Sequence, residues 1–264
     1  MTNLILIVGK PMSGKSSSAS TWEKPILFFD FDGNSSSIFN LKNSKGELVA
    51  GEVDKIEVIN CIPKVSNSIL NFKTILKGNT IPSYAPAAVE VINRVGIILN
   101  EVISGQRKCN TIIFDSITAM FSLWKDMILV NNSQPSLQQQ DYGTLSHILF
   151  KQFLPMLRNL PTKYVILIDH TEIVKDEKTN IVEEFPIAPS KPMGRIFAKE
   201  FMNVWLQLRG VGGATKWMTE PYGFFEYAGS RTGIPNGIEA NFKNVEPYFK
   251  STRKEEVPPV VINK

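Results

Sequence analysis

Residues 9–16 read GKPMSGKS, a full match to the phosphate-binding pattern G-x-x-x-x-G-K-[ST]. Glycine in such a loop lets backbone N–H groups converge on an anion, because it has no Cβ to block the approach. The lysine of the pattern reaches the β- and γ-phosphates of a nucleotide, and the hydroxyl that follows it holds Mg²⁺. The sequence therefore predicts an ATP and Mg²⁺ site that includes Gly9, Lys10, Pro11, Met12, Ser13, Gly14, Lys15, Ser16 and Ser17.

The residues around this loop favour the same reading. The apolar run at residues 4–8 leads directly into it, as a buried strand would. A helix that begins at Ser16 would point its positive end at the phosphates. The alternative is a chance match on a turn rich in glycine and serine, which would leave the strand in front unexplained.

A second magnesium ligand is expected at the end of another buried strand. Residues 111–114 read TIIF and are followed by Asp115, a carboxylate in the position that the site needs. Asp115 could instead cap the helix that starts near Ile117, since Asp and Ser favour that position. The two roles are compatible.

Hydrolysis also needs a group that orients or deprotonates water. Residues 26–31 form an apolar run that carries Asp30, and Asp32 and Gly33 come directly after it. The two carboxylates share one side of an extended chain, and the turn at Gly33 would hold Asp32 nearer the ligand, so Asp32 is the candidate general base. The alternative is that both acids cap a turn before the run of serines at residues 35–37.

These residues need a fold that brings strand ends together. Unalternating apolar runs at residues 4–8, 26–31, 111–114 and 164–168 are typical of parallel strands buried on both faces. Helical spacing appears between them, at residues 89–103 and 145–160. We therefore predict an α/β fold with a mostly parallel central sheet and helices on both faces. Residues 216–219 and 224–227 are expected to add antiparallel strands at the sheet edge. Trp205 and Trp217 are expected in the core or in an interface.

Length and composition predict one domain. Residues 1–249 would form it, with a hairpin-like insertion at 43–63 and a flexible tail at 250–264. Cys61 and Cys109 suggest neither a zinc site nor a disulfide, which favours a reducing cytoplasm. No run of residues has the length and apolarity of a membrane span. The net charge of +4 permits an acidic partner without requiring one.

The order GKPMSGKS, FFDFDG, IIFDS, ILIDH and SRTG resembles the core of RecA-like P-loop ATPases. The nearest resemblance is to AAA-type phage nucleotide-binding proteins related to RecA-like single-strand annealing proteins, and it covers about residues 3–242. It implies that Asp32 activates water, that His170 acts as a polar sensor near the γ-phosphate, and that Arg231 reaches the nucleotide of a neighbouring subunit. His170 satisfied by local backbone and Arg231 on an ordinary surface turn are the alternatives.

Two departures from that family pattern predict slow turnover. Asp32 stands where many relatives carry glutamate, so its reach is shorter. Gly229 stands two places before Arg231, where relatives carry a second cation.

The resemblance also implies partners. Single-stranded DNA would lie near residues 131–142 and near a protruding loop or hairpin at 171–193, and ATP would control a homo-oligomer, a ring or a filament. The first segment offers Gln134, Gln138, Gln139 and Gln140, and the second offers Lys175, Lys178 and Lys191, followed by Arg195. An ordinary solvated hairpin is an equal interpretation of the second segment, because residues 175–178 read KDEK and their charges cancel. A phage or host single-strand binding protein is a further implied partner, and the cytoplasm of an infected bacterium is the implied location.

Three functions follow from these features. The first is an ATPase acting on single-stranded DNA in phage recombination or annealing. The second is a nucleotide-gated interaction module with weak hydrolysis. A small-molecule kinase is a third reading with less support, because no arginine-rich lid segment follows the core strands.

Overall fold

The computed structural model describes most of the chain. Its described residues are 2–40, 48, 50–64, 73–76, 79–82, 85–175, 177, 179–210 and 214–251.

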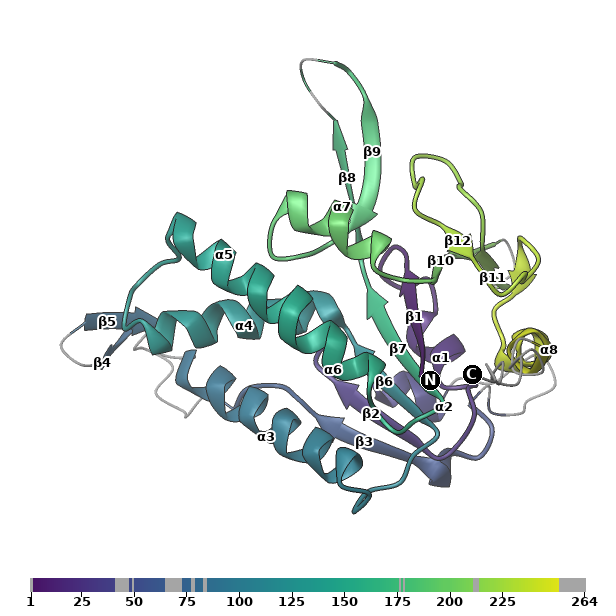
Figure 1. Cartoon of the computed structure of the whole chain (residues 1–264), viewed down its shortest axis with the longest axis horizontal. Coiled ribbons are helices and arrows are strands. Elements are labelled where there is room, and N and C mark those ends of the chain that lie inside the picture. The colour runs from purple at the N-terminus through teal and green to yellow at the C-terminus, as the bar shows by residue number, and fades with distance from the viewer. Residues whose placement is uncertain are drawn as a thin grey trace, which may run out of the picture.

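A central sheet organises the fold (Figure 1). Its strand order is β13-β11-β10-β1-β7-β6-β2-β3, with β12 paired to β10. All pairings from β3 to β10 are parallel, and the later strands are antiparallel. The bounds are β1 Asn3–Val8, β2 Ile26–Asp30, β3 Ile56–Asn60, β6 Thr111–Asp115, β7 Tyr164–Asp169, β10 Asn203–Arg209, β11 Thr215–Met218, β12 Gly229–Ser230 and β13 Ile238–Glu239.

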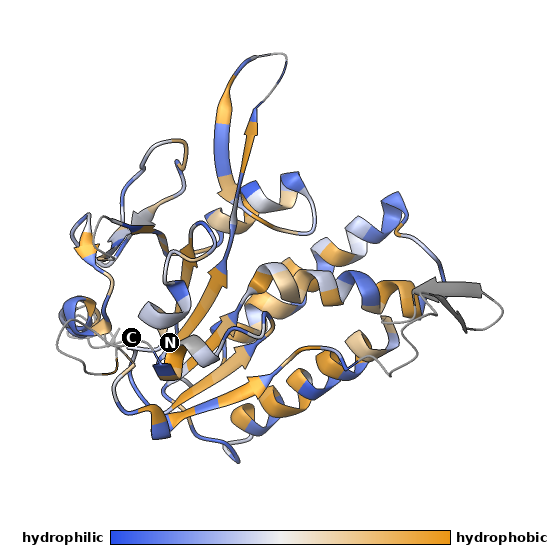
Figure 2. Ribbon diagram, turned by 180° about the vertical axis from the view of Figure 1, so that it is seen from behind, coloured by the Kyte–Doolittle hydropathy of each residue, from blue (hydrophilic) through white to orange (hydrophobic). Residues whose placement is uncertain are grey.

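Helices cover both faces of this sheet, because alternate strand residues point to opposite sides. One face carries α3 Ala85–Ile103, α4 Ile117–Asn131, α5 Gln139–His147, the π-helical turn Ile148–Phe153, α6 Leu154–Arg158 and α7 Lys191–Lys199. The other carries α1 Lys15–Ala19, α2 Ser36–Asn40 and α8 Phe242–Ser251. The predicted α/β class is confirmed, with a mostly parallel central sheet, helices on both faces and antiparallel strands added at one edge. Figure 2 shows the apolar strands between these layers.

Tryptophans fill the core beneath α8. Trp205 and Trp217 are fully buried, with ring centroids 4.9 Å apart, and Trp22 stacks on Trp205 at 5.9 Å. The core placement predicted for Trp205 and Trp217 is confirmed.

The hairpin-like insertion predicted at 43–63 is wrong for its described part. After a 3₁₀ turn at Val53–Lys55, the strand β3 runs parallel to β2 at the sheet edge. An edge strand is only half buried, so Ile56, Val58 and Ile59 are interrupted by polar residues, a pattern that resembles a hairpin. Residues 43–47 and 49 lie outside the described residues.

Two hairpins lie outside the central sheet. β4 Lys73–Leu76 pairs with β5 Asn79–Pro82, and β8 Thr171–Lys175 pairs with β9 Val182–Pro186. The second projects from the body in Figure 1, where the sequence predicted a protruding loop or hairpin. Residues 191–193, which that prediction included, belong instead to α7.

The carboxyl-terminal segments differ from expectation in two places. Residues 216–219 largely coincide with β11, but 224–227 form turns rather than a strand, because buried Phe225 anchors a tight loop against Glu184. Residues 250 and 251 continue α8, and the rest of the predicted tail lies outside the described residues. Within the described part of the chain, no helix has the length and apolarity to cross a membrane.

Candidate functional site

The loop between β1 and α1 has the backbone that its glycines permit. Gly9 has φ 153° and Gly14 has φ 88°, and Met12 between them also has a positive φ, at 62°. A Cβ on Gly9 would lie only 2.7 Å from the carbonyl oxygen of Gln207 on the neighbouring strand. Glycine is therefore required at position 9 both by conformation and by space.

Lys15 lies buried within this loop. Its Nζ donates hydrogen bonds to the carbonyl oxygens of Gly9, at 2.8 Å, and Lys10, at 2.9 Å. Burial lowers the pKa of Lys15 to about 8, although the nearby carboxylates of Asp115 and Asp169 oppose the shift. A buried ammonium with this depressed pKa favours the arrival of an anion, so the loop fits a phosphate group.

The two predicted magnesium ligands lie in contact. Asp115 ends β6, and its buried carboxylate accepts a hydrogen bond from the side chain of Ser16. Burial raises the pKa of Asp115 to about 6. The helix cap that could have explained Asp115 belongs to Ser116 instead, whose Oγ accepts from the Ala119 N–H. A hydroxyl beside a carboxylate suits Mg²⁺, which takes few protein ligands and keeps several waters.

His170 connects the two sides of the site. It follows β7, the strand that separates the phosphate-loop strand from the strand of Asp115. Its Nδ1 lies 3.3 Å from Lys15 Nζ, and its Nε2 lies 3.7 Å from Asp32 Oδ2. An ammonium can only donate, so Nδ1 accepts and Nε2 carries the proton that faces Asp32.

Asp30 and Asp32 have different surroundings. The Asp30 carboxylate accepts hydrogen bonds from the N–H groups of Gly33, Asn34 and Ser35, so the turn-capping alternative holds for Asp30. Asp32 Oδ1 accepts from Ser116 Oγ at 3.1 Å, and its Oδ2 faces His170. Asp32 therefore stands at the mouth of the site with Lys15, Asp115 and His170.

Asp169 does not hold the His170 ring. Its carboxylate accepts from the backbone N–H of His170, at 2.9 Å, and from the hydroxyl of Thr118. Complete burial raises the pKa of Asp169 well above its usual range. The His170 ring itself lies between Lys15 and Asp32. Its contact with Lys15 joins two residues that are 155 positions apart in the chain.

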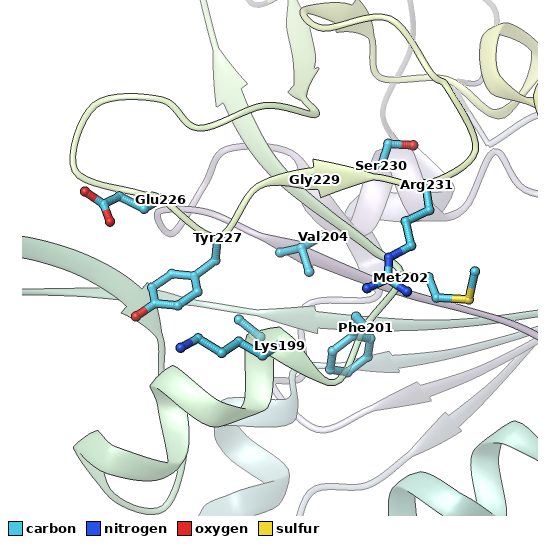
Figure 3. Close-up of a pocket in the computed structure, with 10 residues that line it drawn as sticks. Lys199, Phe201, Met202, Val204, Glu226, Tyr227, Gly229, Ser230 and Arg231 are labelled. Atoms are coloured by element: carbon cyan, nitrogen blue, oxygen red, sulfur yellow. The ribbon is translucent and has the colours of Figure 1, made fainter.

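Arg231 lies apart from these residues. Its backbone N–H bonds to the carbonyl of Met202, which by strand register is level with Leu4. Five residues separate that level from Gly9, or about 16 Å at about 3.3 Å per residue. Arg231 lines a different cavity, of about 540 Å³, together with Lys199, Phe201, Met202, Glu226 and Tyr227 (Figure 3). It does not reach the phosphate loop of its own chain.

Two contacts of the site were missed from the sequence. Ser116 holds Asp32, and Gln207 of β10 donates from Nε2 to the carbonyl of Ser13 in the loop. The signal for Gln207 was present as one amide inside the apolar run VWLQL, since a buried polar side chain needs a partner.

Comparison with known proteins identifies the family. A family model described as an AAA domain matches residues 1–201. The chain belongs to the AAA domain family. This domain is a P-loop NTPase, and its family supports nucleotide binding and ATPase activity in general. Every convergent site residue described above lies within the match except Gln207, and Arg231 lies beyond it.

One similar solved structure is of a prototypical ATPase from the type III secretion system of pathogenic bacteria, with a TM-score of 0.40 and 11% identity. The match covers 79% of this chain and 53% of that one, so the chain spans about half the length of that ATPase. The comparison with curated proteins gave no match.

Proposed function

We propose that this AAA domain is a Mg²⁺-dependent ATPase with the residues of the phosphate loop, Asp115, Asp32 and His170 as its active site. The observation that carries the proposal is the convergence of Lys15, Asp115, His170 and Asp32 from four separate strand ends. Strands β1, β2, β6 and β7 are parallel neighbours, so their carboxyl ends meet at one edge, where ligands bind in open α/β sheets.

The residues fit ATP and Mg²⁺ in distinct ways. Residues 9–17 would hold the phosphates through backbone N–H groups and the Lys15 ammonium, and Ser16 and Asp115 would hold the metal. When bound, Mg²⁺ would supply positive charge that offsets the negative charge of the phosphates.

The chain's own residues prepare the water-activating side. Ser116 Oγ fixes one oxygen of Asp32, which leaves the other to accept a proton. The proton on His170 Nε2 faces that same carboxylate, while Nδ1 faces Lys15. His170 thus joins the cation of the phosphate loop to the candidate base, which supports a sensor role for it.

We further propose that the active form is a homo-oligomer, a ring or a filament, in which Arg231 serves a neighbour. The register that keeps Arg231 from its own phosphate loop supports a role in trans. Arg231 is exposed at the surface beside Lys199 and Met202, where a neighbouring subunit can approach it.

Arg231→Ala should lower turnover at least tenfold and leave ATP affinity within about twofold, because an arginine finger stabilises mainly the transition state. The measurement is steady-state ATPase activity beside nucleotide binding at equilibrium. Mixing the two variants Arg231→Ala and Lys15→Ala provides the matched test. The first supplies an intact phosphate loop and the second supplies Arg231, so turnover returns only if the two meet across a subunit interface. Equal loss of binding and turnover would contradict the finger role.

Single-stranded DNA is the partner that we propose from the resemblance, in phage recombination or annealing within an infected bacterial cell. The exposed Gln139 and Gln140, in the first turn of α5, support contact at the start of that helix. Gln134 is less available, since its side chain donates to buried Asp141, whereas Gln138 is exposed and donates to that carboxylate only through its backbone N–H. In the second segment, Arg195 pairs with Glu183 at 2.7 Å, and Lys178 lies outside the described residues.

ATPase activity with single-stranded oligonucleotides should rise severalfold at low salt and return to the basal rate as salt increases. Each phosphate contact contributes a slope of about −0.7 to the salt dependence on single strands. The measurement is turnover over a salt series, with Lys15→Ala as the background control. Turnover that does not respond to DNA at any salt concentration would remove DNA as the partner.

A specific observation favours a nucleotide-gated interaction module as the second candidate. The hairpin at residues 171–186 carries five acidic residues against two lysines, a balance that repels DNA phosphates. It also exposes Ile173 and Ile181, the latter to 63%. An acidic, apolar projection suits a protein partner, and it would act through contacts controlled by the nucleotide at the base of β8. A rate that DNA leaves unchanged supports this candidate.

A further inference from the structure

One buried side chain connects the phosphate loop to the far edge of the sheet. Gln207 lies in the middle of β10, is 1% exposed, and has the buried Trp205 and Leu206 before it. A primary amide placed among apolar side chains costs free energy unless its donors and acceptor are bonded. The hydrogen-bond partners of the Gln207 amide therefore indicate which part of the structure it holds in place.

Gln207 is bonded at both ends of its amide. Its Nε2 donates to the carbonyl oxygen of Ser13 in the phosphate loop, at 3.0 Å. Its Oε1 accepts from Ser18 Oγ of α1, at 2.6 Å, and from Trp217 Nε1 of β11, at 3.0 Å. Because an indole N–H can only donate, Trp217 fixes the oxygen on its side and turns the NH₂ group toward Ser13.

The bond to Ser13 sets the direction of the next N–H group. The peptide bond is planar and trans, so the Ser13 carbonyl and the Gly14 N–H point in opposite directions. With the carbonyl held toward Gln207, the Gly14 N–H points away from β10. Backbone N–H groups that converge on the phosphates are the basis of anion binding in this loop.

The loop also rests directly on β10 and β11. A Cβ on Gly9 would lie 2.7 Å from the Gln207 carbonyl oxygen, and one on Gly14 would lie 3.4 Å from Gln207 Nε2 and 3.1 Å from a Thr215 methyl group. Both glycines of the phosphate loop thus lie against Gln207. Gly9 lies against the backbone carbonyl of Gln207, and Gly14 lies against its side-chain amide.

We propose that Gln207 is a positioning residue for nucleotide binding, and that its bond to Trp217 makes the Trp217 indole a reporter of the state of the phosphate loop. Gln207 acts through Ser13 and Gly14 rather than by touching the nucleotide. The role rests on the proposed function, because it needs the loop to bind ATP.

Replacement of the amide tests the role directly. Gln207→Leu keeps the approximate volume and removes the bond to Ser13, so ATP and ADP affinity should each fall about tenfold. Gln207→Glu keeps an acceptor for Trp217 but turns an oxygen toward the Ser13 carbonyl, and it should weaken binding at least as much. The matched control is Trp205→Phe, a buried indole on the same strand whose Nε1 has no hydrogen-bond partner among the described residues, and its affinity should stay within twofold.

Indole N–H signals in nuclear magnetic resonance give a readout that a merely structural role would not move. Trp217→Phe and Trp205→Phe assign the two signals in the labelled protein. Addition of ATP to the wild type should shift the Trp217 signal more than the Trp205 signal. Properly folded Gln207 variants that bind ATP within twofold of wild type, or a Trp217 signal that ignores bound ATP, would overturn the proposal.

A failure of the proposed function gives a different result. If the wild type binds no ATP, the ATPase proposal fails on its own. The positioning role is then tested in the nucleotide-free protein. There, Gln207→Leu should change the chemical shifts of the Gly14 backbone amide and the Trp217 indole N–H. An unchanged Gly14 signal in a folded variant overturns it there.

Discussion

Lys15→Ala is expected to abolish measurable ATP hydrolysis and to weaken ATP binding at least about a hundredfold. Its ammonium is buried in the phosphate loop and is held by the carbonyls of Gly9 and Lys10. Hydrogen bonds to charged groups contribute ~1.5–3 kcal/mol each, and this lysine is expected to reach two phosphates. The measurements are titration calorimetry with ATP and steady-state phosphate release.

A second variant separates lost binding from lost folding. Lys15→Met keeps most of the side-chain volume and removes a charge whose burial is unfavourable, as the pKa lowered to about 8 indicates. Its thermal midpoint should equal or exceed that of the wild type, while ATP binding is lost. Wild-type turnover by either variant would remove the central claim that residues 9–17 form the nucleotide site.

The features that sequence reasoning predicted are those encoded locally. The phosphate loop is contiguous, and the strands β1, β2, β6 and β7 are apolar runs because both faces of each are buried. Asp115 was predicted because it follows such a run directly, whereas His170, one residue beyond Asp169 at the end of β7, was implied by the family resemblance. In these cases the strand delivers its next residue to the ligand edge, so position along the chain determines position in space.

Other features depend on register between distant segments. β3 is an edge strand, and its polar residues resemble those of a hairpin until its pairing with β2 is known. Gln207 reaches Ser13 across 194 positions, and only the parallel register of β10 with β1 brings them together. The same register places Arg231 away from its own phosphate loop, which no local pattern around Gly229 could indicate.

Asp30 and Asp32 were predicted only in part from the local sequence. The alternation of side chains along a strand predicted that both carboxylates lie on one side of the chain, but it did not indicate which of them caps a turn. The structure distinguishes them by their partners. Asp30 binds three consecutive N–H groups, while Asp32 binds Ser116 and faces His170. This difference in partners allows the general-base role to be tested with its own internal control.

Asp32→Asn is expected to lower ATP turnover by about 10²- to 10⁴-fold, the usual contribution of a general base, and to leave ATP affinity within about threefold. The amide keeps the shape of the side chain and its hydrogen bond to Ser116 Oγ, but it cannot take up a proton. The measurement is single-turnover hydrolysis beside equilibrium binding. Asp32→Glu restores the carboxylate with a longer reach, so it should recover at least a tenth of wild-type turnover.

The matched control is Asp30→Asn, because Asp30 precedes Asp32 by two residues and its carboxylate holds the turn rather than the site. The amide keeps one acceptor oxygen for Gly33 and Asn34 but loses the bond from the Ser35 N–H, so stability should fall by ~1–3 kcal/mol, and turnover should change only a fewfold. If Asp30→Asn abolished turnover while Asp32→Asn did not, the base would be misassigned. If neither variant lowered turnover, water would be activated by another group, and His170, whose ring lies beside Lys15 and Asp32, would be the next candidate to test.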